Sequence, residues 1–561
     1  MVSVSADSVS KPQVFDAPDL LASLAGAYKA SPVAKIDGFP VFDFLDNVSR
    51  SAGRTHDLDA GFNNLLPSIA KRAAGVNIAP VIQGGYYLSL PDNTTTELAN
   101  GTTFSFPNAA LLRLDFRGIR SGEDLARAAS VPRAPRRLAH RQSAADPGPC
   151  RIQHTSPRPS NIPRPIDEHK DHWAGAFALG GSAYSDITVL ELNSFMSLYS
   201  DVTSDLACGV GDQREFHRFF ESFATTFKSS GKKRLVLDLS ANSGGFEAVL
   251  ADLIAQLFPR EGATPPFRYR VRATPVLSWI LENSPGALGQ PVGSTGHVER
   301  IVDDARALGK GNWGPELLAG DNFTALLRRD MKDQKQSVGI DHTALTEALV
   351  KPEDMIILTD GDCHSSCALL VDWLTQLGVR TVAMGGRPTS GPMAAVGGTK
   401  GAGLLSWYSA QSAVYRTLRN TNGSAPRGLQ LPSLDDAPLL MAGDGVGAMD
   451  VWHDKATVPA QFEVAPADCR LFYTLDTFLN IEAMWKAAAD AAWRGAPCAP
   501  GSKMNGAKSA AAGARLAAVK EDELVVAVAT AEQARDSAAL RRASDGGWAG
   551  LTVEEDLRWQ W

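Results

Sequence analysis

Residues 355–377 read MIILTDGDCHSSCALLVDWLTQL. The apolar run at its start predicts a buried strand, and the periodic apolar residues from Leu369 onward predict a helix. Ser365 and Ser366 lie where the strand turns into the helix. A serine there can cap the helix by accepting a hydrogen bond from an orphan amide. A catalytic nucleophile needs the same exposed position, so both interpretations stand at this point.

A second stretch of the same kind precedes it. Residues 232–258, KKRLVLDLSANSGGFEAVLADLIAQLF, predict a strand, a turn with Gly244 and Gly245, and an apolar helix. Adjacent glycines let the backbone approach a ligand closely, and the N–H groups at a helix start favour negative charge. The turn therefore predicts an anion site, or an oxyanion hole if the charge forms during a reaction.

Strands and helices alternate through this part of the chain. YSDITVLELNSFM (184–196) predicts a buried strand, EFHRFFESFATTFKSSG (215–231) a helix with a phenylalanine-rich core face, and VRTVAMGG (379–386) another strand. This order indicates an α/β fold with βαβ crossovers and a sheet covered by helices. Ligands of such sheets bind at the carboxyl ends of the strands, where both turns lie.

The chain has 561 residues, which predicts two or three domains. We divide it into an N-terminal mixed region (1–116), an Arg/Pro-rich linker or insertion (117–168), a core (169–500) and a helical or disordered tail (501–561). A net charge of −7 argues against nucleic acid as a partner, and no apolar run is long enough for a membrane span. The six cysteines lack zinc-finger spacing, and we expect neither metal nor cofactor.

Three motifs in order resemble the tail-specific protease family, serine peptidase family 41, and most closely its fungal branch. They are RLVLDLSANSGG (234–245), TDGDCHSSCALLVDWL (359–374) and VRTVAMGGRPTSGPMAAVGGTKGAG (379–403). PAQFEVAPADCRLFYT (459–474) is similar to a C-terminal signature of that branch, and SPVAKIDGFPVFDFL (31–45) to part of a PDZ-like module. The resemblance implies a crotonase-like βαβ peptidase core behind an N-terminal PDZ-like region.

The resemblance also implies roles for the residues of the two turns. Ser365 matches the nucleophile, and Ser366, Gly244 and Gly245 match the donors of the oxyanion hole. Ser366 as nucleophile is the alternative. Helical spacing places Ser366 on the same face as apolar residues three and four positions later, so we expect it to be buried.

The cysteines on either side of Ser365 have two interpretations. Cys363 and Cys367 are four residues apart, a spacing typical of packing residues. In a secreted protein they could instead form a cystine that clamps the turn.

The general base is the part of the pattern that is missing. Pro392 stands where Ser/Lys members of the family carry lysine, and Lys400 lies in a different glycine-rich motif. Other members use a histidine far upstream, which in fungal relatives would precede Met1. His364 adjoins the serine but should point elsewhere. His172 and His453 are candidates without support from a motif.

We therefore expect an upstream extension that carries this histidine and a signal segment. Five N-x-[ST] sequons agree with a secretory or extracellular ancestry; they lie at Asn47, Asn93, Asn100, Asn322 and Asn422. The 117–168 block has no clear family counterpart and is interpreted as a linker, a retained intron or a frameshift.

The function implied by the resemblance is a serine endopeptidase that cleaves peptides or proteins through an acyl-enzyme. Similar fungal peptidases occur in clusters for ribosomal cyclic-peptide mycotoxins, which makes a precursor peptide a candidate substrate. The alternatives are an N-terminally truncated, catalytically impaired peptide-binding relative, and a crotonase-like acyl-CoA enzyme. The sequence shows no evident set of acidic catalytic residues for an acyl-CoA enzyme of this kind.

Overall fold

The computed structural model describes most of the chain up to residue 506. The described ranges are 1–26, 28–52, 55–67, 69–73, 92–108, 117–129, 162–196, 206–260, 268–286, 297–309, 311–318, 320–328, 340, 342, 345–431, 445–453, 456–463 and 465–506. Most of the Arg/Pro-rich segment and the tail from 507 lie outside them. Inside the expected linker, α5 (Gly122–Ala129) is a helix, and β7 (Asp167–Glu168) already pairs with the central sheet.

A seven-stranded sheet forms the centre of the molecule, in the order β19-β16-β15-β10-β9-β8-β7. Neighbours from β9 to β19 pair in parallel, whereas β8 and β7 run antiparallel. The predicted buried strands are confirmed. The bounds are β8 Ala174–Ala178, β9 Ile187–Leu192, β10 Arg234–Asp238, β15 Met355–Thr359, β16 Arg380–Met384 and β19 Cys469–Leu471.

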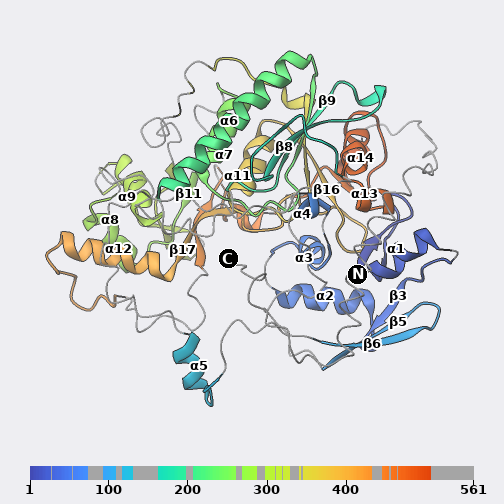
Figure 1. Ribbon diagram of the computed structural model, residues 1–561. Helices are drawn as coiled ribbons and strands as arrows, with labels where there is room; N and C mark the ends of the chain where they lie inside the picture. Colours follow the sequence, from blue (N-terminus) through green and yellow to red (C-terminus); the bar gives the residue numbers. More distant parts are fainter. Residues whose placement is uncertain are drawn as a thin grey trace, which may run out of the picture.

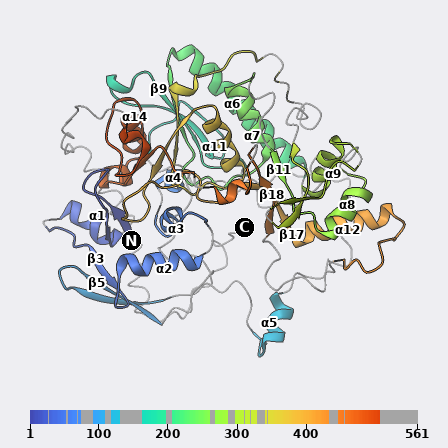
Figure 2. The same ribbon diagram turned by 180° about the vertical axis from the view of Figure 1, so that it is seen from behind.

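Helices cover both faces of this sheet (Figures 1 and 2). On one face lie α6 (Leu206–Ser230), α7 (Glu247–Leu257) and α11 (Ser366–Gln376), and the predicted aromatic core face of α6 is confirmed. On the other face lie α4 (Ile69–Ala73) and α14 (Ile481–Trp493). Because strand side chains alternate, Leu235 and Leu237 join the first core while Val236 joins the second. The sheet is therefore buried on both faces, as parallel sheets are.

A second lobe extends from the edge of the core. Its antiparallel sheet has the order β14-β11-β18-β17 and is packed with three helices. The bounds are β11 Arg268–Arg270, β14 Leu327–Arg328, β17 Gly401–Ser406, β18 Gly445–Val451, α8 Pro275–Asn283, α9 His297–Ala307 and α12 Trp407–Asn420. A small ribbon, β12 (Glu316–Leu318) with β13 (Asp321–Phe323), completes it. None of the described helices is long and apolar enough to cross a membrane.

The N-terminal region has its own sheet, β4-β3-β5-β6, with α2 packed on it and a separate apolar core (blue in Figure 1). The bounds are β3 Val33–Ile36, β4 Phe39–Pro40, α2 Val41–Ala52, β5 Asn93–Leu98 and β6 Thr103–Pro107. A ribbon of β1 (Val2–Val4) and β2 (Gln13–Phe15) precedes it, with α1 (Ala17–Ala25). Short α13 (Leu475–Leu479) packs near this ribbon, because Leu475 lies against its apolar cluster.

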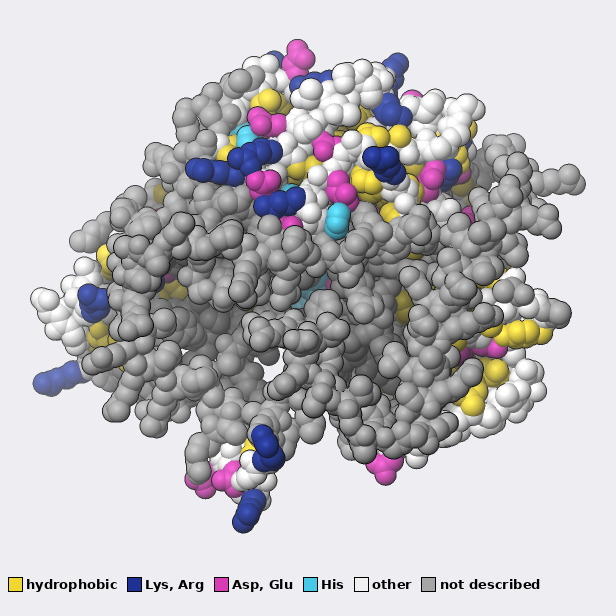
Figure 3. All heavy atoms as spheres, in the orientation of Figure 1, with side chains coloured by type: hydrophobic (Ala, Val, Ile, Leu, Met, Phe, Trp, Pro, Cys, Tyr) yellow, Lys and Arg dark blue, Asp and Glu magenta, His cyan; other side chains and the backbone are white. Residues whose placement is uncertain are grey.

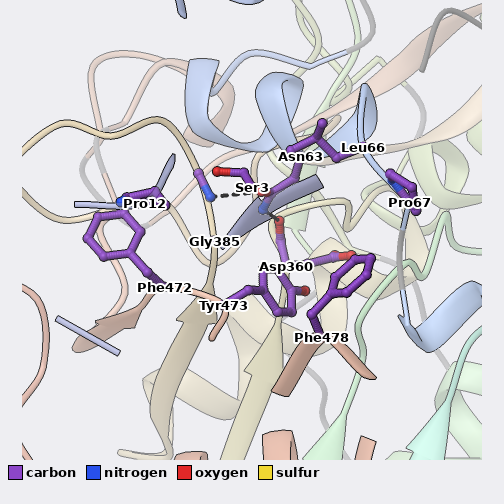
Figure 4. Close-up of a pocket in the computed structure, with 11 residues that line it drawn as sticks. Ser3, Pro12, Asn63, Leu66, Pro67, Asp360, Gly385, Phe472, Tyr473 and Phe478 are labelled. Carbon is purple, nitrogen blue, oxygen red and sulfur yellow. Dashed lines mark hydrogen bonds between the residues drawn. The ribbon is translucent and has the colours of Figure 1, made fainter. Parts of the chain in front are cut away.

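Helix α3 (Leu58–Asn64) joins the N-terminal region to the edge of the central sheet. The Asn63 amide donates to the carbonyls of Asp360 and Met384, at 2.7 and 2.8 Å, and accepts from the Gly386 N–H at 2.7 Å. Figure 4 shows Asn63 and Asp360 at a small cavity that Tyr473 and Phe478 also line. One side chain therefore satisfies the backbone just beyond two neighbouring strands, β15 and β16.

A buried ion pair strengthens the same junction. The Arg470 side chain is 1 % exposed and donates to Asp59 Oδ1 of α3 at 3.1 Å. It also donates to the carbonyls of Gly385 and Arg387, so its guanidinium is well satisfied. On the face shown in Figure 3, the described basic and acidic side chains are interspersed.

Replacing Asp59 with alanine should destabilise the fold by about 3 kcal/mol, because it leaves the Arg470 charge buried without its carboxylate. Urea unfolding of both proteins would measure the difference. Glu97→Ala is the control, since it breaks the exposed Lys35–Glu97 pair and should cost less than about 1 kcal/mol. Equal stabilities of Asp59→Ala and Glu97→Ala would contradict the role given to this ion pair.

Candidate active site

The two strand-to-helix turns lie side by side, as the sequence predicts. Because β10 pairs in parallel with β15, with Asp238 opposite Leu358, both turns leave the same edge of the sheet. Two hydrogen bonds also connect the turns directly. The Ala241 N–H donates to the Asp360 carboxylate at 2.9 Å, and the His364 N–H donates to the Asn242 carbonyl at 3.2 Å.

Ser365 has the backbone of a strained turn. Its φ of 51° and ψ of −120° lie outside both the helical and the extended regions, directly before α11. Its side chain makes no capping hydrogen bond, so the helix-cap interpretation of this serine is wrong. Such a conformation costs on the order of 1–3 kcal/mol in a residue other than glycine and recurs at functional sites. The side chain is partly exposed.

Ser366 has a different environment. It is fully buried, and its hydroxyl donates to the Gly245 carbonyl at 2.9 Å. The expected burial of Ser366 on the core side of α11 is confirmed. Its Oγ holds the glycine turn against the serine turn, whereas the Ser365 Oγ has no hydrogen-bond partner among the described residues.

The glycine turn approaches Ser365 more closely than any other residue type would allow. A Cβ on Gly244 would lie 2.9 Å from the Ser365 Cβ, and one on Gly245 would lie 2.5 Å from the Phe195 carbonyl carbon. Both glycines have positive φ, 97° and 140°. The two residues are therefore glycine for reasons of space as well as of backbone conformation.

The two glycine amides differ. The Gly244 N–H donates to Asn242 Oδ1 at 2.8 Å, so it is already occupied. The N–H groups of Gly245 and Ser366 have no acceptor among the described residues. Of the backbone donors proposed from sequence, these two are thus available for a ligand. Asn242, which the sequence motifs did not indicate, makes the difference between the two glycines because its side chain accepts from the Gly244 N–H.

A disulfide closes the serine turn. Cys363 and Cys367 are bonded, with their Cα atoms 5.4 Å apart, on either side of Ser365, and both are buried. The interpretation as a cystine, rather than as packing residues alone, is confirmed. Cys469 and Cys498 form a second disulfide.

Two of the histidines considered from sequence are engaged elsewhere. His364 accepts from the Thr399 N–H through Nδ1, at 3.2 Å, and its Nε2 lies 3.0 Å from Asp362 Oδ1. Both of its ring nitrogens therefore have partners other than Ser365, which agrees with the expected orientation of His364 away from the serine. His172 pairs with Glu168, next to β7 at the far edge of the sheet.

His453 is held between two carboxylates. Its ring nitrogens lie 2.9 Å from Asp372 of α11 and 2.7 Å from Glu463. The hydrogen bond to Asp372, opposed by partial burial and helped by Glu463, raises the pKa of His453 to about 9. An imidazole that is protonated at neutral pH cannot serve as a base.

Lys400 is engaged by another group, because its Nζ donates to the Glu463 carbonyl at 2.8 Å. Burial lowers the pKa of Lys400 in spite of nearby carboxylates. Pro392, at the position of the family lysine, is exposed.

His56 is the histidine that sequence reasoning missed. The backbone N–H of His56 donates to the Gly397 carbonyl at 2.7 Å. Two residues after Gly397, the Thr399 carbonyl accepts from the backbone N–H of Ser365 at 3.0 Å. Among the histidine side chains that the structure describes, His56 alone makes no hydrogen bond or ion pair with a described residue. Burial, with the charges of Lys400 and His364, lowers the pKa of His56, which favours its neutral form. No family motif marks this position.

Several known proteins resemble this chain in sequence. Residues 1–117 match the family described as the CPAF-like PDZ domain. The Peptidase S41 family protein ustP of Aspergillus flavus is 28 % identical over 485 residues, which covers 79 % of this chain and 97 % of that protein. The Peptidase S41 family protein phomP1 of Diaporthe leptostromiformis is 26 % identical over 573 residues, covering 88 % and 81 %.

Among solved structures, mature CPAF matches with a TM-score of 0.38 and 12 % identity, covering 88 % of this chain and 84 % of that one. Mature CPAF complexed with lactacystin matches with a TM-score of 0.33 and 14 % identity, covering 67 % and 65 %. The sequence matches define the class that the chain resembles: it is similar to fungal S41 family peptidases, and its first 117 residues match the CPAF-like PDZ domain. The resemblance to the fungal branch of serine peptidase family 41 is thereby confirmed.

The raised pKa of His453 predicts how stability changes with pH. The folded pKa of about 9 exceeds the ordinary value of 6.5. The stabilisation is therefore complete below pH 6.5 and is lost as the pH rises through 9. After discounting for solvent exposure we expect about 1 kcal/mol. Urea unfolding at pH 6 and pH 9.5 should show a smaller pH-dependent loss in His453→Gln than in the wild type; identical losses would contradict the assignment.

Proposed function

We propose that the chain is a serine endopeptidase that cleaves peptide or protein substrates through an acyl-enzyme. The observation that carries the proposal is the combination at Ser365. A strained, partly exposed serine lies beside two backbone N–H groups, those of Gly245 and Ser366, that have no acceptor among the described residues. An oxyanion hole needs such pairs of donors next to the nucleophile.

In the proposed reaction, Ser365 Oγ attacks the carbonyl carbon of the scissile peptide bond. The hydroxyl proton passes to a general base, and the negative charge that forms on the carbonyl oxygen is held by the two N–H groups. The leaving amine takes the proton as the C–N bond breaks, and water then hydrolyses the ester. The Ser366 hydroxyl takes no part in the proposed reaction and only positions the glycine turn, since it donates to the Gly245 carbonyl.

We assign the core to the crotonase-like arrangement. The support is the repeated unit, β10 with α7 and β15 with α11, whose turns meet at paired backbone amides. For the substrate we propose a ribosomally made precursor peptide of a fungal secondary metabolite. This finer proposal rests on the resemblance to the fungal branch, and trimming of candidate precursor peptides by the purified protein, read by mass spectrometry, tests it.

A fluorophosphonate probe tests the enzyme directly. The wild type should be labelled, because the probe needs an activated serine and an oxyanion hole. Ser365→Ala should lose labelling completely. Ser366→Ala is the matched control: it keeps the backbone N–H and should retain labelling at a reduced rate. If the folded wild type is not labelled, the endopeptidase proposal fails and a peptide-binding role takes its place.

His56 is the histidine to test as the general base. Loss of a base can reduce the rate by roughly 10⁴, and the pH profile should lose its lower limb. The rate of probe labelling between pH 5 and 9 in His56→Gln measures both effects, with His172→Gln as the control. A His56→Gln protein with the wild-type profile would show that the proton goes to another group.

A further inference from the structure

Three ligand-type side chains converge between α6, α7 and the segment before β15. Asp252 comes from α7, His217 from α6 and His342 from the segment before β15. Asp252 Oδ1 lies 2.9 Å from His217 Nδ1 and 2.6 Å from His342 Nε2. One ligand atom of each residue lies within 4.8 Å of the others. The three positions are far apart in sequence, so no spacing motif announces them.

The carboxylate at the centre of this cluster is buried. The Asp252 side chain is 1 % exposed, and its described ionic partners are the two histidines alone. Its second oxygen, Oδ2, is buried and has no hydrogen-bond partner among the described residues. A buried carboxylate is costly unless a cation or several donors compensate it. Asp252 therefore has capacity for a further partner.

The surroundings of His217 fit a metal ligand. Its other ring nitrogen, Nε2, lies 3.4 Å from the carboxylate of Glu221, one turn along α6. Metal-bound histidines commonly donate their second nitrogen to a carboxylate in this way, which fixes the ring with the free nitrogen towards the metal. The side chains of His217 and His342 are 17 % and 21 % exposed, so an ion and a water ligand can reach the cluster.

We propose that His217, Asp252 and His342 form a binding site for a divalent transition metal, with zinc as the best fit. Two imidazoles and one carboxylate are a donor set typical of Zn²⁺, whereas Mg²⁺ and Ca²⁺ prefer oxygen alone. Tetrahedral bonds of about 2.0–2.2 Å require donor atoms about 3.3–3.6 Å apart. The histidines therefore move outward by roughly half an ångström when the ion replaces the shared protons.

The site lies apart from Ser365 in the chain but on a connected element. Helix α7 begins two residues after Gly245, and the segment of His342 leads into β15, which carries the serine turn. A metal here ties α6, α7 and the approach to β15 together. Its expected effect is therefore on stability, and the proposal does not depend on the peptidase reaction.

Metal binding to the chelator-treated full chain tests the proposal. Calorimetry with Zn²⁺ should give one site with a dissociation constant in the micromolar range or below, and Zn²⁺ should raise the melting temperature. Bound Co²⁺ should show the intense visible absorption of a tetrahedral complex. His342→Gln should weaken binding at least tenfold, and His172→Gln should bind like the wild type.

Two results would overturn the proposal. One is the absence of stoichiometric binding in the wild type, with no cobalt spectrum above that of the aqueous ion. The other is equal affinity of the wild type and His342→Gln. If His342→Gln does not fold, the cobalt spectrum of the wild type decides alone, because weak octahedral bands would indicate adventitious binding.

Discussion

The parallel pairing of β10 with β15 is the constraint on which the site depends. It brings the ends of both strands to one edge, so that Asp360, at the end of β15, can accept from Ala241 of the neighbouring turn. Gly244 then approaches Ser365 at a separation that leaves no room for a side chain. The strain at Ser365 persists because the surrounding hydrogen bonds and the Cys363–Cys367 disulfide hold the turn.

The same edge explains the attachment of the N-terminal region. Asn63 of α3 binds the backbone at the ends of β15 and β16, and Asp59 of α3 pairs with Arg470 of β19. A separate apolar core under β3 and β5 means that this region has its own packing, yet it is anchored by buried polar contacts. Polar contacts of this kind have strict geometry, so they fix the position of α3 more closely than apolar contact alone would.

Much of the fold could be predicted from local pattern. The apolar runs of β9, β10 and β15 and the phenylalanine face of α6 are strong periodic signals, and the two turns follow from them. The burial of Ser366 followed from helical spacing. Which of the two glycine N–H groups is available to a ligand could not be predicted from spacing, because the Asn242 side chain folds back and accepts from the Gly244 N–H. The crotonase-like arrangement and the C-terminal tail remain predictions.

Contacts between distant segments could not be predicted from a single sequence. The backbone N–H of His56 binds the carbonyl of Gly397, which lies more than 300 residues later in the chain. The His217–Asp252–His342 cluster likewise joins three elements whose spacing carries no motif. The two carboxylates that hold His453, Asp372 and Glu463, are likewise brought to it only by the fold. Such groups are defined by tertiary packing, which local propensity does not encode.

A crystal structure with a peptide boronate, which mimics the tetrahedral intermediate, tests whether Ser365 is the nucleophile. We predict a covalent bond from boron to Ser365 Oγ, with one boronate oxygen about 2.7–3.1 Å from the backbone nitrogens of both Gly245 and Ser366. A bond to Ser366, or an oxygen directed away from these two amides, would contradict this prediction.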